Sequence, residues 1–427
     1  MSEMRTTEYT PMQTLIRLAA AGARGETVND LCVDWKEVFP FVAEQHVQSL
    51  VACALLHSPE LECPEELREY LLNAMRSESS GNLIRRQRIM HLLTEMHAAD
   101  IDAKVLKGYA VAGCYVHPEC RGSVDTDLLI DISQEKQALC FLQEHDFRVD
   151  PRAATSQHAV CQHKKYGMLE LHVALYAELI QEIWFQGIDV SELTKEPSIS
   201  VSELDGSFTT LGHTDQLIFL TLHMIKHFIL EGLTLRMMLD IALYFSCNRD
   251  RIDHVRFWDT VERMHYAKLV NGILWIMISY GDFEVADFPG LKGAVPEHVQ
   301  MILNDLQTGG YMGNKEQAER LESGMEYNHQ LMRKQKNALQ YTLYMVGWKI
   351  KSGLAYMFPT VKALQKLYPI TQKYPVLMPT CWLWQACSFP VKKILSGALK
   401  RDVRSDDSNM TAITKKRIEI FRALGMI

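Results

Sequence analysis

Residues 121–132 read Arg121-Gly-Ser-Val-Asp125-Thr-Asp127-Leu-Leu-Ile-Asp-Ile132, a stretch in which acidic and apolar side chains alternate. Successive side chains of a β-strand point to opposite faces, so a strand here places Asp125 and Asp127 on the same side. The intervening side chains are mostly aliphatic and are expected to face a hydrophobic core. Asp131 shares the acidic face but lies at the far end, where we expect an exposed acid. Two carboxylates on the open face of a strand predict a divalent-metal site.

A second alternating segment, Met168-Leu-Glu170-Leu-His172-Val-Ala-Leu175, carries a third carboxylate. Glu170 and His172 share one face of this strand, and aliphatic side chains occupy the other. We expect the two strands to be neighbours, so that Asp125, Asp127 and Glu170 converge on the metal. His172 either supports Glu170, contacts a nucleotide or serves as a structural histidine, and the sequence leaves these three roles open.

The composition is that of an ordinary globular protein. The chain has 427 residues, of which 47% are hydrophobic and 23% charged, a length that predicts about three folding units of ~100–200 residues each. A net charge of −7 and a pI of about 6.2 give no bulk signature of nucleic-acid binding. The ten cysteines contain no Cys-x-x-Cys spacing, so we expect reduced thiols rather than a zinc site.

The chain carries no apolar signal segment near Met1, and its apolar runs are shorter than the ~20 residues that span a bilayer. We therefore expect no membrane span and a cytoplasmic location.

The apolar pattern divides the chain into three regions. Residues 1–98 are predicted to be helical, with separate helices near 64–75 and 82–97, and residues 99–205 to contain a small mixed α/β sheet. After about Ala177 the pattern is helical, and residues 206–427 are predicted to be a C-terminal helical domain. Its Pro- and aromatic-rich segment, residues 357–390, is expected to be ordered and extended. The predicted fold class is α+β, predominantly helical, with the sheet embedded between helical regions.

Lys107 and Gly108 lie where a predicted strand ends and a small-residue helix begins. A lysine and an unobstructed helix N-terminus are suited to bind phosphate, and Arg121 can add a bidentate guanidinium. We expect these three residues to hold nucleotide phosphates. The run Arg85, Arg86 and Arg88 is interpreted as the solvated face of a helix, with phosphate binding as the alternative.

Three segments together resemble a known family: Leu106-Lys107-Gly108, Arg121-x-x-x-Asp125-x-Asp127 and Glu170-Leu-His172. They are similar to an uncharacterised bacterial nucleotidyltransferase family of the polymerase-beta-like nucleotidyltransferase superfamily. The likeness continues through Leu220-x-x-His223-x-x-x-His227, Arg236-x-x-x-Asp240 and the Pro-rich segment, and it covers roughly residues 80–390. Its most specific part lies between residues 104 and 175.

The resemblance implies a polymerase-beta-like catalytic core within residues 99–205. It implies transfer of NMP from an NTP to a hydroxyl acceptor, with release of pyrophosphate and with Mg²⁺ or Mn²⁺ as cofactor. Asp125, Asp127 and Glu170 would be the catalytic and metal-binding residues. The wider superfamily usually has Gly-Ser or Gly-Gly at the phosphate-binding turn, whereas this chain has Lys107-Gly108 and no serine there.

Two other functions remain open from the sequence. The first is a catalytically silent nucleotide-binding regulator or scaffold. The second is a phosphohydrolase whose metal is held by His223, His227 and Asp240, although buried structural histidines and an Arg236–Asp240 pair within one helix explain the same residues. The acceptor is not predicted, and protein, peptide, sugar, RNA and small molecules all remain candidates.

Overall fold

The computed structural model describes residues 9–28, 31–123, 125–150, 157–185, 188, 194–203, 206–308, 317–335, 340, 364, 368, 370–384 and 411–427. The chain divides into two compact units. The first comprises Met1–Tyr327 and Lys416–Ile427, and it contains the sheet and the predicted site residues. The second comprises Asn328–Lys415.

The described N-terminal part is helical, as α1 (Pro11–Arg24), α2 (Trp35–Glu44), α3 (Gln48–His57) and α4 (Glu65–Ala98). Helix α1 begins at a capping box, in which Thr10 and Gln13 exchange side-chain and backbone hydrogen bonds. Gly22 lets α1 approach α3 closely, because a Cβ at this position would overlap the carbonyl oxygen of Leu50.

Helix α4 is continuous over 34 residues, so the prediction of separate helices near 64–75 and 82–97 is wrong. A glycine inside a helix costs only ~1 kcal/mol relative to alanine, and tertiary contacts offset that cost around Gly81. Asn82, for example, donates hydrogen bonds to the carbonyl oxygens of Glu119 and Arg121.

The described strands form one mixed seven-stranded sheet in the order β3-β4-β5-β2-β1-β7-β6. Strands β2 and β5 are parallel neighbours at its centre, and β1 pairs antiparallel with β2. The strands are β1 (Lys104–Leu106), β2 (Asp125–Leu129), β3 (Arg148–Asp150), β4 (His158–His163), β5 (Gly167–His172), β6 (Ile199–Glu203) and β7 (Gly206–Thr210). The helices between them are α5 (Tyr109–Ala112), α6 (Glu135–Glu144) and α7 (Glu178–Trp184).

The hairpin β6–β7 corrects the expectation that the chain stays helical after Ala177. Strand β7 pairs parallel with β1, where Lys104 is the register partner of Thr209, and Thr210 donates a hydrogen bond of 2.6 Å to the Val105 carbonyl. The sheet therefore extends beyond residue 205. The division at 98 and 205 remains a proposal.

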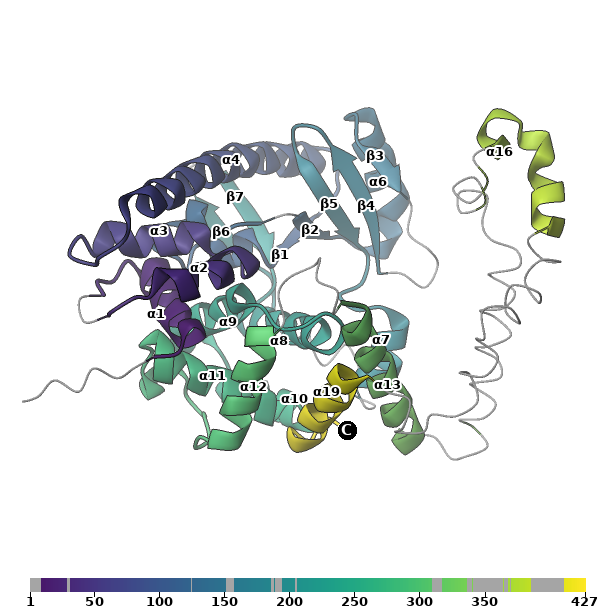
Figure 1. The fold of residues 1–427 in the computed structure, drawn as a ribbon. Coiled ribbons are helices and arrows are strands. Elements are labelled where there is room, and N and C mark those ends of the chain that lie inside the picture. Colours follow the sequence, from purple (N-terminus) through teal and green to yellow (C-terminus); the bar gives the residue numbers. More distant parts are fainter. Residues whose placement is uncertain are drawn as a thin grey trace, which may run out of the picture. The chain divides into compact units, whose positions relative to one another are not determined.

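A hydrophobic core lies between the sheet and the C-terminal half of α4. Ile89, Leu92 and Met96 of α4 pack in the same buried cluster as Leu128 of β2 and Leu171 of β5, and Figure 1 shows α4 running along the sheet. Residues from α6 and β7 complete this cluster. The strands thus direct their aliphatic side chains toward α4 and leave the acidic face for the opposite side.

The rest of the first unit is helical, with α8 (His213–Leu230), α9 (Leu235–Asn248), α10 (His254–Arg263), α11 (Ala267–Gly281) and α12 (Pro296–Thr308). Helix α13 (Gln317–Gln335) and helix α19 (Ala412–Ala423) contribute residues to both units, and α16 (Ile370–Lys373) belongs to the second. Arg417 is buried and pairs with Asp305 at 2.8 Å. None of the described helices has both the length and the apolar character needed to cross a bilayer.

The fold class is α+β and predominantly helical, as predicted. Within the Pro- and aromatic-rich segment 357–390, residues 364, 368 and 370–384 are described, and 370–384 are mainly helical rather than extended. Most of the remaining prediction for this segment lies outside the described residues.

Candidate active site

The three predicted carboxylates lie together on the face of the sheet opposite the α4 core. Asp125 and Asp127 come from β2 and Glu170 from β5. Asp127 and Glu170 are direct register partners in the parallel pair, which places their side chains on one face. One ligand oxygen from each of the three residues falls within a group spanning no more than 4.8 Å. Because these oxygens are close and are the hard donors that Mg²⁺ and Mn²⁺ accept, the donor set fits a divalent metal.

Lys107 lies against the two aspartates. Its ammonium is 3.3 Å from Asp125 Oδ2 and 3.0 Å from Asp127 Oδ2. Burial would lower the pKa of Lys107, but the negative charges of Asp127 and Asp125 outweigh burial and raise it. Lys107 is therefore a charged counter-ion at the mouth of the carboxylate cluster.

The turn that presents Lys107 is formed by two residues with positive φ, 29° at Lys107 and 47° at Gly108. Glycine tolerates such angles without strain, whereas lysine does not, so the turn depends on its surroundings. Helix α5 after it has only four residues, so it is shorter than the small-residue helix that we expected and its dipole is weak. A serine is nevertheless near: the Ser123 hydroxyl lies 3.7 Å from where a Cβ on Gly108 would be.

His172 has a defined place among the carboxylates. Its Nε2 is 3.0 Å from Asp127 Oδ1 and 3.4 Å from Glu170 Oε2. Burial would lower the pKa of His172, but hydrogen bonds to Asp127 and Glu170 outweigh it and raise the pKa. For Glu170 the balance is reversed: burial would raise its pKa, and the hydrogen bond with His172 and nearby cations lower it. The histidine thus fixes the two carboxylates relative to each other.

His158 joins this cluster, although we did not predict it. It is the register partner of His172 on β4, and its Nε2 lies 3.8 Å from Glu170 Oε2. His158, Glu170 and His172 form a second group whose ligand atoms lie within 4.8 Å of one another. The alternation of β4 could have placed His158 on this face, had its pairing with β5 been known.

Arg121 has a different environment from the one expected. It is buried, and its guanidinium makes two hydrogen bonds to the Asp240 carboxylate of α9, at 2.8 and 2.6 Å. Tyr115 donates a third hydrogen bond to Asp240 at 2.7 Å. The bidentate face that we expected to hold phosphate is therefore engaged with Asp240, although Arg121 still lines a pocket beside Asp125.

Two other arginines hold the segment that leads into β2. Arg236 donates a hydrogen bond of 2.9 Å to the Gly122 carbonyl, and Arg85 donates one to the Ser123 carbonyl. Arg85 is thus half-buried and hydrogen-bonded to the backbone, in addition to its place on the face that is interpreted as solvated. Arg236 also does not form the predicted pair within its own helix, because the Asp240 carboxylate is bound by Arg121.

The histidines of α8 do not form a metal site with Asp240. His227 Nδ1 bonds Glu231 at 2.6 Å, and neither of the two possible metal-binding groups among the described residues includes His223, His227 or Asp240. Burial, followed by the charges of Lys107 and other nearby cations, holds the pKa of His223 well below its ordinary value.

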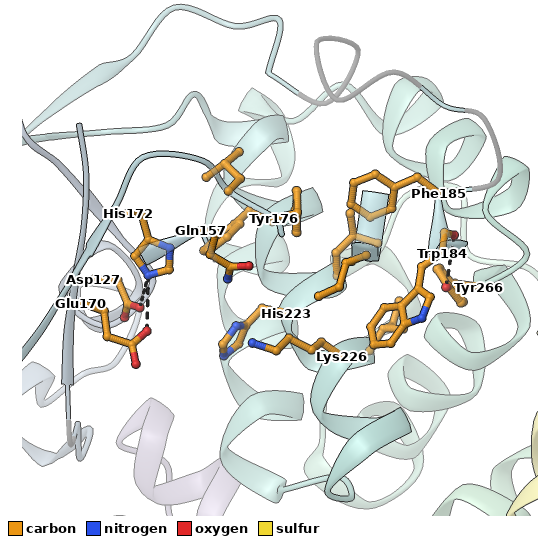
Figure 2. A pocket seen from close by; sticks show the side chains of 15 residues that line it. Asp127, Gln157, Glu170, His172, Tyr176, Trp184, Phe185, His223, Lys226 and Tyr266 are labelled. Carbon is orange, nitrogen blue, oxygen red and sulfur yellow. Dashed lines mark hydrogen bonds and ion pairs between the residues drawn. The ribbon is translucent and has the colours of Figure 1, made fainter. Parts of the chain in front are cut away.

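Two pockets meet at the carboxylates. The first encloses about 460 Å³ of empty space, including space open to solvent, and presents Lys107, Arg121 and Arg236 beside Asp125. The second encloses about 530 Å³ on the same measure and extends from Asp127, Glu170 and His172 to a set of aromatic residues. Figure 2 shows this second pocket, with the acidic group at one end and the aromatic side chains at the other. His223 lines both pockets.

Comparisons with known proteins identify the family of this chain. No curated protein matches the chain. A family described as uncharacterised nucleotidyltransferases matches residues 32–280, which is more than half of the 427 residues and includes every predicted site residue. The chain therefore belongs to this family of uncharacterised nucleotidyltransferases.

Proposed function

We propose that this protein is a metal-dependent nucleotidyltransferase that transfers NMP from an NTP to a hydroxyl acceptor and releases pyrophosphate. The observation that carries the proposal is the convergence of Asp125, Asp127 and Glu170 from two paired strands. Membership of a nucleotidyltransferase family supports it.

Asp125, Asp127 and Glu170 would hold Mg²⁺ or Mn²⁺. When bound, such a metal neutralises charge on the attacking and leaving oxygens of in-line phosphoryl chemistry. Asp127 is almost fully buried and is held by His172, so its carboxylate is oriented before any ligand arrives. This pre-organisation favours ligand binding, because less side-chain freedom is lost on binding.

The pocket beside Asp125 is suited to the triphosphate. Lys107, Arg121 and Arg236 give it positive charge, and Gly108, which has no side chain of its own, lines the same pocket. Because Asp240 engages the guanidinium of Arg121, we propose that Arg121 contributes mainly its charge and the position of the preceding loop. Lys107 and Gly108 are the proposed direct phosphate ligands.

Glu170 is the proposed general base. It lies at the opposite end of the carboxylate group from Lys107's pocket and lines the second pocket. A carboxylate in this place can accept the proton of the acceptor hydroxyl as its oxygen attacks the α-phosphorus. His172, 3.4 Å from Glu170 Oε2, positions that carboxylate.

The test uses each α-³²P-labelled NTP with Mg²⁺ or Mn²⁺ and a cell lysate. The wild type is expected to transfer label, and the double variant Asp125→Asn/Asp127→Asn is expected to transfer none. Asp131→Asn is the matched control, because Asp131 is an exposed acid a few residues further along the same stretch. Equal labelling by wild type and double variant would contradict the proposal.

One observation favours a second candidate, a nucleotide-binding regulator without turnover. Lys107 already forms ion pairs with both aspartates, so a metal has to compete with its ammonium for the same oxygens. Metal-dependent NTP binding that is never followed by pyrophosphate release, with every acceptor fraction tested, would support the regulator.

A further inference from the structure

The pocket beyond Glu170 has the character of a small-molecule site. Apart from its polar residues, its lining is apolar, with the aromatic side chains of Tyr176, Trp184, Phe185, Phe219 and Tyr266 beside the aliphatic side chains of Leu175, Ile180, Leu222 and Ile225. Its near wall is the acidic group of Asp127, Glu170 and His172, as Figure 2 shows. Concave sites with mostly apolar walls and a few convergent polar groups are typical of small-ligand binding, and the lining of this pocket has that character.

Two buried polar atoms in the wall of this pocket have no hydrogen-bond partner within the described structure. They are the hydroxyl oxygen of Tyr176 and Nδ1 of His172, on side chains that are 6% and 3% exposed. A buried polar group without a partner costs about 1–3 kcal/mol, so such groups are normally satisfied. Both atoms therefore indicate that a polar ligand or ordered water completes the site.

Two further polar side chains line the gap between the acidic and aromatic ends. Gln157 and Lys226 are drawn there in Figure 2, together with His223. Among the described residues, neither the amide of Gln157 nor the ammonium of Lys226 makes a hydrogen bond or ion pair. After the hydrogen bond with His227, the charge of Lys226 also helps to lower the pKa of Glu231, but the described residues show no ion pair between Lys226 and Glu231, so the ammonium is available to an anionic ligand.

Different carboxylates line this aromatic pocket and the cationic pocket beside Asp125, which is proposed to bind the triphosphate. Asp125 lines only the cationic pocket with Lys107, whereas Glu170 lines only the aromatic pocket. The carboxylate of Glu170, the proposed general base, attracts the acceptor hydroxyl and repels an anionic group elsewhere on the acceptor. The anionic group of a ligand would therefore lie toward Lys226, away from Glu170.

We propose that the aromatic pocket binds the acceptor, and that this acceptor is a small anionic molecule with a hydroxyl group and a flat or apolar body. This inference rests on the proposed nucleotidyl transfer. The acceptor oxygen forms a bond to the α-phosphorus of the NTP, and the bond from that phosphorus to the bridging oxygen of the β-phosphate breaks. Pyrophosphate leaves, and the hydroxyl proton passes to Glu170. The anionic group pairs with Lys226, and the aromatic side chains hold the body.

The experiment separates a cell extract by ultrafiltration into a low-mass and a macromolecular fraction. The full-length protein receives either fraction with an α-³²P-labelled NTP and Mn²⁺. We expect the label in a low-mass product that anion-exchange chromatography shows to carry a negative charge beyond its phosphodiester. Lys226→Met removes the proposed ion-paired hydrogen bond to the anionic group of the acceptor. We therefore expect the variant to raise the KM for the low-mass fraction at least about tenfold.

Three controls make the result specific to Lys226. Lys226→Arg keeps the charge and is expected to restore most of the affinity. Lys136→Met removes an exposed lysine of α6 outside both pockets and is expected to behave as wild type. Binding of a non-hydrolysable NTP analogue with Mn²⁺, measured by calorimetry, is expected to be unchanged in Lys226→Met, which shows that the donor site is intact.

Two outcomes would overturn the inference and leave nucleotidyl transfer standing. One is label found only in the macromolecular fraction, and the other is a Lys226→Met variant with the wild-type KM for the low-mass fraction. Absence of labelling with both fractions, all NTPs and both metals would instead remove the proposed function, and the acceptor inference with it.

Discussion

Replacement of Lys107 by methionine separates two roles of this side chain. In the protein without metal, the Lys107 ammonium neutralises Asp125 and Asp127, so Lys107→Met should lower the free energy of unfolding. With metal present, the same ammonium competes for the aspartate oxygens, so the variant should bind metal alone more tightly than wild type. It should also bind NTP more weakly, because Lys107 is a proposed phosphate ligand.

The distances from Lys107 to the two aspartates set the size of the expected loss of stability. A unit charge 3.0 Å from Asp127 Oδ2 interacts with it by roughly 5 kcal/mol at an effective dielectric constant of ~20, before the cost of burying both charges is subtracted. Measured losses from breaking buried ion pairs are about 3–5 kcal/mol. Lys107 is 15% exposed and Asp125 25%, so we expect a loss near the lower end, about 3 kcal/mol. Saturating Mg²⁺ should restore most of the lost stability.

Urea unfolding followed by tryptophan fluorescence measures both effects, once in EDTA and once in excess Mg²⁺. Lys104→Met is the matched control. Lys104 lies on β1, just before the Lys107 turn, but it forms no ion pair among the described residues. A Lys107→Met variant as stable as wild type in EDTA would refute the counter-ion role. Equal stabilisation of both proteins by Mg²⁺ would refute the competition.

Two further predictions concern the site, and one concerns the ion pair between Arg17 of α1 and Asp282 at the end of α11. Asp240→Ala leaves the buried charge of Arg121 without a partner, and chemical denaturation should show a loss of about 3–5 kcal/mol; a loss below ~1 kcal/mol would contradict the pairing. A hydrogen bond from Arg17 lowers the pKa of Asp282, so Asp282→Asn should lower the free energy of unfolding by at most about 1 kcal/mol, as expected for an exposed pair. This difference from wild type should be present above about pH 4 and disappear as the pH falls through the lowered pKa of Asp282. A difference that persists in acid would contradict this. Imidazole ligands bind transition metals in preference to Mg²⁺. In calorimetry, His158→Ala should therefore weaken Mn²⁺ binding roughly tenfold and leave Mg²⁺ binding unchanged. An equal effect on both metals would count against a ligand role for His158.

The sequence was sufficient to place the centre of the fold. Period-two alternation in residues 121–132 and around Glu170 identified β2 and β5, because one face of each strand packs on a core while the other carries acids. The hairpin β6–β7 could also have been predicted, since Ile199 and Val201 alternate with serines and Asp205-Gly206 is a strong turn signal. The continuity of α4 could not, because it depends on contacts such as that of Asn82 with Glu119, which is distant in sequence.

Local patterns also account for the part of the site that could be predicted. Asp125, Asp127 and Glu170 converge because strand register fixes which side chains share a face. The environment of Arg121 was not predictable, because its partner Asp240 is 119 residues away and belongs to a helix of a different region. The same reason applies to Ser123 at the Gly108 turn and to Lys226 in the aromatic pocket, where only the tertiary fold brings the groups together.

The central proposal is that the carboxylate cluster directs attack at the α-phosphorus. The most direct measurement compares an α-³²P-labelled NTP with the same NTP labelled at the γ-phosphate, in parallel reactions with Mn²⁺ and the fractionated extract. Nucleotidyl transfer predicts the α label in the acceptor product and the γ label in pyrophosphate, with both lost in Asp125→Asn/Asp127→Asn. Appearance of the γ label in inorganic phosphate or in the acceptor, with no α label transferred, would contradict it.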